Sequence, residues 1–219
     1  FDVRSPIAVR AALFNAPAQI DASGESGSAS FDVSFGYTGS YGAAAHGLEP
    51  ATVTSDNVVQ DPDQNFDPND GYSKRHDFNL SGAAFFRIAV PPESVADPDA
   101  IDLDIFVYDP NGVQVASSTS GGTDELVDIL LPQDGTWSVY VHGWQTAGPS
   151  ADYDMYSWII SATPGGNLNI DSAPSSATLG AVETIGVSWT GATAGAWHLG
   201  AVSHTGDAGL MGLTLVNVD

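Results

Sequence analysis

Glycine and proline divide this chain into short segments, and that division limits the folds it can adopt. The sequence contains 24 glycines and 13 prolines among 219 residues, and they interrupt it roughly every eight to twelve residues. Between them lie short apolar runs with little helical periodicity. Such spacing suits short strands joined by turns, so the sequence predicts an all-β fold built as an antiparallel sandwich or jelly roll.

The clearest strand signal lies in residues 101–108. Aliphatic side chains alternate there with aspartates and aromatic rings, so in a strand the two sets would lie on opposite faces. The aliphatic face comprises Ile101, Leu103, Ile105 and Val107, and the other face comprises Asp102, Asp104, Phe106 and Tyr108. Residues 109–112 follow with the residue types of a type I turn. The segment therefore predicts a strand, a tight turn and a returning strand.

Other short apolar runs extend this pattern into a complete β-domain. They alternate like strands or are rich in β-branched residues, and turn residues separate them. The expected strands lie at residues 85–90, 113–115, 126–131, 137–142 and 155–160. Together with residues 101–108 they predict a jelly-roll domain over residues 76–163.

The two flanks of that domain share a sequence plan. Residues 20–46 and 170–204 each run through a Ser-rich or Ala-rich stretch and a short strand to a histidine. Each flank alone offers too few strands for an independent core. We therefore expect both to pack as one fibronectin III-like sandwich around the inserted jelly roll; two separate small sheets are the alternative. The expected boundaries are residues 1–75, with an acidic linker at 56–71, and residues 164–219, which would pack with residues 1–55.

The charge balance is extreme and argues against two classes of partner. The chain carries 27 acidic residues against five Lys plus Arg, a formal net charge of -22. A surface of this sign repels phosphate backbones and anionic lipid, so we expect no nucleic-acid binding and no membrane insertion. No apolar run reaches the roughly 18 residues of a spanning helix. No cysteine is present, so the core, bound metal or both must provide stability.

The start of the sequence indicates a processed chain. It opens on Phe1 rather than methionine and shows no signal peptide, which predicts a piece of a longer precursor. We expect its location to be extracellular, either secreted or at the cell surface.

An acidic stretch with alternating oxygen ligands is the first candidate metal site. Asp61, Asp63, Asn65 and Asp67 fall on alternate positions, and calcium prefers six to eight oxygen ligands that converge from such a loop. The stretch is not an EF-hand, because Phe66 stands where that loop needs glycine. A solvated linker is the alternative.

A second candidate calcium site begins in the strand at residues 101–108. Asp102 and Asp104 would lie about 6.6 Å apart on one face, where their charges repel unless a cation or an arginine lies between them. Asp97 and Asp99 lie just upstream and could complete the shell. The alternative is a wet face with solvated charges.

A third candidate site is aromatic. Tyr140 and His142 alternate onto the same face of the expected strand that starts at residue 137, and Trp144 follows at its end. Aromatic side chains on an open sheet face could grip a protein or polysaccharide chain. The alternative is that this face is buried against the flanking sandwich.

The motifs of an enzyme are missing from the sequence. The histidines are not spaced as zinc ligands, no cysteine could assist them, and there is no G-x-S-x-G nucleophile elbow or phosphate-binding loop. We therefore expect no catalytic residue in this chain.

Three segments resemble a known family. Residues 86–88, the run D-L-D-I-F-V-Y-D-P-N-G at 102–112 and the run G-T-W-S-V-Y-V at 135–141 resemble the bacterial pre-peptidase C-terminal domain, a jelly roll similar to the P-domains of proprotein convertases. Residues 2–10 resemble the closing strand of the fibronectin-like domain that follows the catalytic domain in cucumisin-like subtilases.

The resemblance implies a function as well as a fold. The parent would be a secreted subtilisin-like serine endopeptidase, and this chain its non-catalytic C-terminal accessory region, which stabilises the protease or binds protein substrate. Its partners would be its own catalytic domain and insoluble protein or polysaccharide. In related collagen-binding domains the acidic linker binds calcium, which implies the same for Asp61 to Asp70. A cell-surface adhesive or self-assembling module with no attached protease is the alternative.

Overall fold

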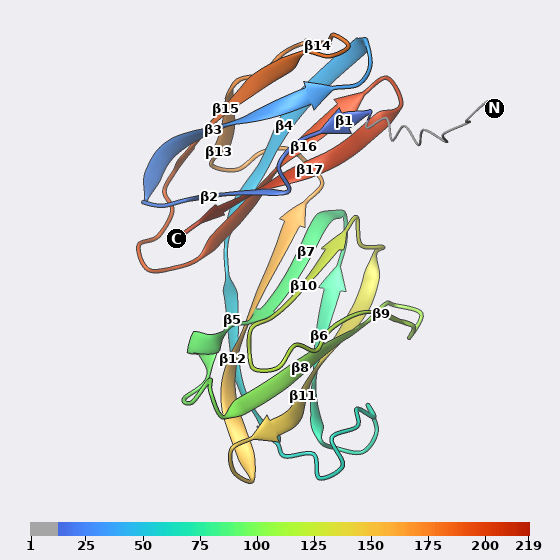
Figure 1. Cartoon of the computed structure of the whole chain (residues 1–219), viewed down its shortest axis with the longest axis vertical. Helices are drawn as coiled ribbons and strands as arrows, with labels where there is room; N and C mark the ends of the chain where they lie inside the picture. The colour runs from blue at the N-terminus through green and yellow to red at the C-terminus, as the bar shows by residue number, and fades with distance from the viewer. Residues whose placement is uncertain (1–12) are drawn as a thin grey trace, which may run out of the picture. The chain divides into compact units, whose positions relative to one another are not determined.

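The computed structural model describes residues 13–219, so the predicted closing strand at residues 2–10 lies outside the described residues. The described part is almost entirely β-strand, and its single helical element is the short 3-10 helix Pro92–Ser94. All its sheets pair antiparallel except for one parallel strand pair. The predicted all-β sandwich fold is confirmed (Figure 1). Between residues 13 and 219, no helix has the length and hydropathy needed to traverse a bilayer.

The chain divides into two compact units. Unit 1 comprises Phe1–Leu48 and Gly165–Asp219, and unit 2 comprises Glu49–Pro164. The sequence of unit 2 is thus inserted into that of unit 1, and both flanks contribute strands to unit 1 (Figure 1). Residues 49–75, which the sequence-based division assigned to the first flank, count with unit 2.

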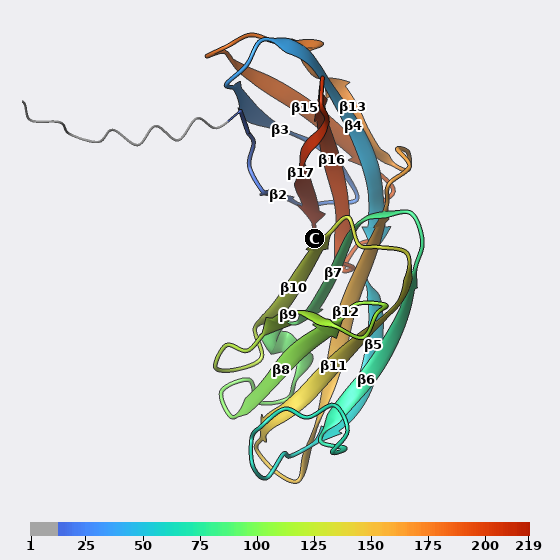
Figure 2. The same ribbon diagram turned by 90° about the vertical axis from the view of Figure 1, so that its right-hand side faces the viewer.

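Unit 2 is a sandwich of two four-stranded sheets (Figure 2). One sheet has the order β10-β7-β12-β5 and the other the order β6-β11-β8-β9. The strands are β5 (Thr52–Val59), β6 (Ser73–Leu80), β7 (Ala83–Val90), β8 (Ile101–Tyr108), β9 (Gln114–Ser118), β10 (Glu125–Leu130), β11 (Gly135–Thr146) and β12 (Ser150–Ser161). β5 and β6 were not expected. In β5 only Val58 is buried in the core, so the strand lacks the alternation that would mark it, and it takes in the start of the expected acidic linker.

The core of unit 2 confirms the alternation at residues 101–108. The aliphatic side chains of β8 are buried together with the inward-facing side chains of β7, β11 and β12. The best-buried members are Phe86, Ile88, Val90, Leu103, Ile105, Val107, Val139, Val141 and Met155, each with no exposed surface. The predicted turn follows β8: the Gly112 N–H donates to the Asp109 carbonyl over 2.9 Å, and Gly112 adopts a φ of 76° that favours glycine.

Unit 1 is also built from two sheets. One has the order β1-β3-β15-β13 and the other the order β14-β4-β16-β17-β2, in which β2 pairs parallel to β17. The strands are β1 (Phe14–Asn15), β2 (Gln19–Ala22), β3 (Ser26–Phe35), β4 (Gly39–Pro50), β13 (Leu168–Ser172), β14 (Ser176–Ala177), β15 (Val182–Thr190), β16 (His198–Gly206) and β17 (Gly209–Val218). Strands from both flanks pair directly, because β3 lies beside β15 with Phe31 opposite Ile185.

A buried polar chain crosses the core of unit 1. His204 has no exposed surface; its Nδ1 lies 2.7 Å from the Tyr41 hydroxyl and its Nε2 lies 2.9 Å from Thr214 Oγ1. Thr214 Oγ1 also donates to the Pro17 carbonyl over 2.8 Å. Both ring nitrogens are therefore satisfied without charge. Burial lowers the pKa of His204 from 6.5 to about 4, so the ring stays neutral at pH 7.

We expect unit 1 to lose stability in mild acid because of His204. A histidine whose folded pKa lies below its unfolded value contributes stability that is present above pH 6.5 and is lost as the pH falls toward about 4. The loss amounts to about 3 kcal/mol. Amide hydrogen exchange of β16 and β17 between pH 7 and 4 measures it, and His204→Gln should remove this part of the pH dependence. An imidazole that titrates near pH 6.5 by NMR would contradict the prediction.

Candidate functional site

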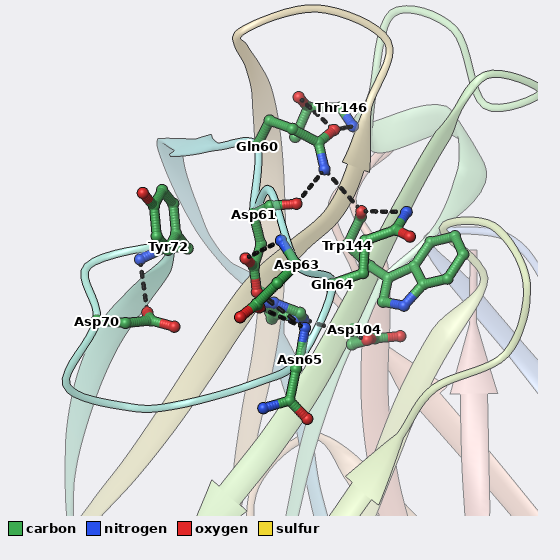
Figure 3. Close-up of polar contacts among 11 residues, drawn as sticks. Gln60, Asp61, Asp63, Gln64, Asn65, Asp70, Tyr72, Asp104, Trp144 and Thr146 are labelled. Carbon is green, nitrogen blue, oxygen red and sulfur yellow. Dashed lines mark hydrogen bonds and ion pairs between the residues drawn. The ribbon is translucent and has the colours of Figure 1, made fainter.

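The loop at residues 60–72 joins β5 to β6 and is tied at both ends to the bulged end of β11. Figure 3 shows the bonds near its first end, from Gln60 to Trp144 and Thr146. The Asp61 N–H donates to the Gly143 carbonyl over 2.9 Å, and the Gly143 N–H donates to the Tyr72 carbonyl over 3.2 Å. Gln60 adds a side-chain clamp, since its Nε2 donates to the Trp144 carbonyl and its Oε1 accepts from the Thr146 N–H, each over 2.8 Å. The loop therefore begins and ends at fixed points.

Beneath this loop, His142 lies between two carboxylates. Its Nε2 is 2.8 Å from Asp61 Oδ2 and its Nδ1 is 3.3 Å from Asp104 Oδ2. The side chains of His142 and Asp61 are 1% and 0% exposed, and that of Asp104 is 9% exposed. A neutral imidazole carries a single N–H, so both contacts are hydrogen bonds only when the ring is protonated. The arrangement is a buried, charged Asp61–His142–Asp104 array.

The pKa shifts agree with that protonation state. Burial by itself would lower the pKa of His142, but the hydrogen bonds and negative charges of Asp104 and Asp61 raise it above its usual value. Burial would raise the pKa of Asp61, but its bonds to His142 and to backbone N–H groups lower it. The stabilising effect of His142 is therefore lost as the pH rises through its folded pKa, and that of Asp61 is lost in acid.

The aspartates of the loop, Asp61 among them, also accept hydrogen bonds from backbone N–H groups of the same loop. Asp61 accepts from the N–H groups of residues 63 and 65, each over 3.1 Å. Asp63 accepts from Asn65 over 3.2 Å and Asp67 from Asn69 over 2.9 Å. These are local turns of the kind that aspartate forms. Across residues 13–219, no group of three or more His, Cys, Asp or Glu side chains is placed to hold a metal ion. Calcium binding by Asp61, Asp63, Asn65 and Asp67 stays a prediction.

The predicted ligands of the second calcium site have separate surroundings. Asp104 belongs to the charged array, and Asp97 is exposed in the loop before β8. Asp99 and Asp102 line one cavity of about 280 Å³ together with Gly122 and Gln145. Burial raises the pKa of Asp102, and the charge of Asp104 adds to the effect.

Sequence reasoning missed Glu125, which is buried near this second site. It is 1% exposed, burial raises its pKa, and the charge of Asp104 adds to the rise. Within the described chain, Glu125 Oε2, Asp102 Oδ1 and Thr123 Oγ1 are buried without a hydrogen-bond partner. No sequence spacing links Glu125 to Asp102, because the two lie on different strands, β10 and β8.

The aromatic candidates lie on the outer face of the sheet β6-β11-β8-β9. Tyr140 of β11 is opposite Phe106 of β8, and its ring centroid is 5.4 Å from that of Tyr108. Phe66, from the acidic loop, stacks on Phe106 at 3.8 Å with an interplanar angle of 7°. It also lies 5.7 Å from both Tyr140 and His142.

Of the three predicted binding residues, the structure thus brings Tyr140 and His142 together. Trp144 lies within the bulge of β11 and joins the site through its carbonyl, which accepts from Gln60 and Gln64. The sequence analysis did not place Phe66 in this cluster. The available signal was that Phe66 is an aromatic residue inside an otherwise polar, acidic run.

Replacement of Gly143 should separate the loop from β11. A Cβ at this position would lie 2.2 Å from the Val59 carbonyl oxygen, which is backbone and cannot rotate away. We expect Gly143→Ala to lower the free energy of unfolding of unit 2 by about 1–3 kcal/mol. Gly148→Ala is the matched control, because a Cβ there meets nothing within 4 Å. Equal melting temperatures for the two variants would contradict this account.

Replacement of His142 should lower the free energy of unfolding of unit 2 more than replacement of Gly143. His142→Leu leaves Asp61 and Asp104 buried without their shared cation, and we expect a loss of about 3–5 kcal/mol, as for other broken buried ion pairs. Adding Asp61→Asn should restore part of that loss, since it removes one of the unpaired charges. Chemical denaturation of the single and double variants measures both effects. If the change in the free energy of unfolding of the double variant equals the sum of the changes of the two single variants, His142 and Asp61 are not coupled.

Solved structures give matches of low identity. Residues of this chain align with the pre-peptidase C-terminal domain of a collagenase from Bacillus anthracis at 14% identity, with a TM-score of 0.35, over 50% of this chain and 90% of that one. Tripeptidyl peptidase 2 aligns at 10% identity, with a TM-score of 0.34, over 94% of this chain but 20% of that one. A glycosylation-associated protein complex from Streptococcus agalactiae aligns at 7% identity, with a TM-score of 0.26, over 59% of this chain and 36% of that one.

The family match is confined to unit 2. It covers less than half of the chain. It begins at Tyr72, the last residue of the acidic loop, whose carbonyl accepts from the Gly143 N–H, and it ends at Gly143 in the bulge of β11. It includes the predicted D-L-D strand and the turn after it. Residues 72–143 match the bacterial pre-peptidase C-terminal domain, and a domain of this non-catalytic, accessory kind is therefore detected within unit 2.

Proposed function

We propose that this chain is the non-catalytic C-terminal accessory region of a secreted, subtilisin-like serine endopeptidase, and that it anchors the enzyme on protein substrate. The observation that carries the proposal is the pre-peptidase C-terminal domain at residues 72–143. The fibronectin-like and subtilase-like character of the flanks supports it through the sequence resemblance alone. The partners are the peptidase's own catalytic domain and an insoluble protein outside the cell.

The surroundings of the histidines support a non-catalytic role. Both ring nitrogens of His142 face carboxylates, so neither can take a proton from a hydroxyl nucleophile. His46 does lie beside a serine, with 3.0 Å between its Nε2 and Ser203 Oγ. Both residues are buried, however, and the Ser203 hydroxyl also contacts the Ala44 carbonyl over 3.3 Å. A substrate could not reach this pair without opening the sheet.

Sedimentation with insoluble protein tests the anchoring. We expect the purified chain to leave casein and ester substrates intact but to bind particulate collagen or keratin. Tyr140→Ala and Trp144→Ala should weaken binding severalfold, whereas Leu126→Ala, an exposed aliphatic change on the other sheet of unit 2, should not. Binding to insoluble polysaccharide in place of protein would favour the adhesive alternative, and hydrolysis abolished by His142→Ala would overturn the proposal.

We also propose that the stability of this chain depends on calcium. The buried oxygens of Asp102 and Glu125 without partners are compatible with a cation between β8 of one sheet and β10 of the other, where the ion would neutralise carboxylates and hold β8 to β10. The loop carboxylates, which already cap backbone N–H groups, give it less support.

Calorimetry with calcium and with EDTA distinguishes the two candidate calcium sites. We expect added calcium to raise the melting temperature of the chain by several degrees. Asp102→Asn should abolish the rise and Asp63→Asn should preserve it. The reverse pattern would assign calcium to the loop, and a melting temperature unaffected by EDTA would exclude a stabilising calcium ion.

A further inference from the structure

The outer face of the sheet β6-β11-β8-β9 carries more aromatic surface than its position requires. A sheet that packs one face into a core commonly presents polar residues on the other. Here Phe106, Tyr108 and Tyr140 form a continuous aromatic strip across the adjacent strands β8 and β11. All three are half-buried. We name these residues the aromatic strip.

Phe66 covers the aromatic strip. Its ring lies parallel to Phe106, with 3.8 Å between centroids, and it contacts Tyr140 edge-on at 5.7 Å. Aromatic pairs usually prefer offset or edge-to-face geometry with centroids 4.5–7 Å apart. The nearly face-to-face stack of Phe66 on Phe106 therefore buries apolar area without the most favourable arrangement of ring charges. The ring of another aromatic side chain could replace that of Phe66.

The loop that carries Phe66 has few bonds to the sheet between its fixed ends. Its aspartates bond to neighbours in the loop: Asp67 to Asn69 and Asp70 to Tyr72. Besides the ring contacts of Phe66, a bond of 3.2 Å from Gln64 Nε2 to the Trp144 carbonyl ties it to β11. Exposed, polar segments with few buried contacts open at low free-energy cost. The buried Asp61 carboxylate holds the N–H groups of residues 63 and 65. The part of the loop that can move while Asp61 keeps these bonds is therefore residues 66–71.

The charges around the aromatic strip select the kind of ligand. Burial raises the pKa of the Tyr108 hydroxyl, and Tyr140 and then the negative charge of Asp67 add to the rise. Asp67 is exposed in the same loop as Phe66, and the chain as a whole carries a net charge of -22. Arg75 is the nearby cation, and it is already paired with Asp77 over 2.8 Å. A ligand with basic groups beside an aromatic ring would complement this surface.

We propose that residues 66–71 form a lid in which Phe66 acts as an internal substitute ligand, and that the aromatic strip beneath it binds aromatic side chains of extended, basic protein segments. The inference rests on the proposed anchoring function and specifies its surface and its regulation. In the closed state Phe66 occupies the strip. A protein segment that presents an aromatic ring displaces Phe66, and the acids of the displaced loop face the segment's Lys or Arg side chains.

Peptide binding to the full chain tests the lid. The probe is a fluorescent peptide of alternating Lys and Phe, with Lys-Ala and Glu-Phe peptides as controls. If only molecules with an open lid bind the peptide, the apparent affinity equals the intrinsic affinity multiplied by the open fraction. Phe66→Ala removes the ring that closes the lid, so it should bind the Lys-Phe peptide at least about fivefold more tightly than the unaltered chain. Phe66→Ala combined with Phe106→Ala should lose that gain. Leu126→Ala, on the other sheet, should leave the affinity unchanged.

Hydrogen exchange provides a second measurement that needs no substitution. Bound ligands usually protect the amides they cover, but displacement of the lid should make the amides of residues 66–71 exchange faster when the Lys-Phe peptide is added. Protection of those amides, or equal or weaker binding by Phe66→Ala, would overturn the lid while leaving anchoring intact.

Particulate-protein binding separates the aromatic strip from the anchoring function. If neither Phe106→Ala nor Tyr140→Ala changes the binding of particulate protein, the anchoring function stands and the aromatic strip is excluded as its surface. If neither peptide nor particulate protein binds, both proposals fail.

Discussion

The buried contact of His142 with Asp61 and Asp104 is the interaction on which unit 2 depends most. It joins the start of the acidic loop, the middle of β8 and the end of β11, which are far apart in sequence. Burying charges is costly, and the cost is offset here because both ring nitrogens and the carboxylates find hydrogen-bond partners. The same contact fixes the point from which the loop turns back over the sheet. The position of Phe66 over the aromatic strip follows from it.

The array also gives one of the few basic groups of this acidic chain a structural use. The sequence contains five Lys plus Arg and five His for 27 acidic residues. Several of these cations are committed to pairs: Arg87 with Asp128, Lys74 with Asp56 and Arg75 with Asp77. His142 adds a cation in the interior, where screening by salt is weak and a single positive charge can hold two carboxylates. A partner that carries additional cations would thus meet an excess of exposed aspartates.

Much of the fold could be predicted because its signals are local. The alternation in residues 101–108 and the Asp-Pro-Asn-Gly turn follow from strand geometry and turn chemistry, and both are confirmed. β5 could not be recognised, because an edge strand with one buried side chain has no periodic pattern. Within the site, Tyr140 and His142 were found by their alternation. The pairing of His142 with Asp61 depends on a contact across 81 residues, and no local rule reports such a contact.

The insertion of unit 2 into unit 1 has a consequence for the order of folding. β3 pairs with β15, so Asp32 lies opposite Thr184, and this sheet cannot close until the ribosome has made residues 182–190. Unit 2 spans Glu49–Pro164 and is complete well before that moment. Because domains generally fold as units during synthesis, unit 2 can reach its native state while the first flank still lacks the strands it pairs with. The early flank then exposes the edge of β3 for the time needed to translate the last strands, and this nascent intermediate is the form of the protein most exposed to mispairing or chaperone binding.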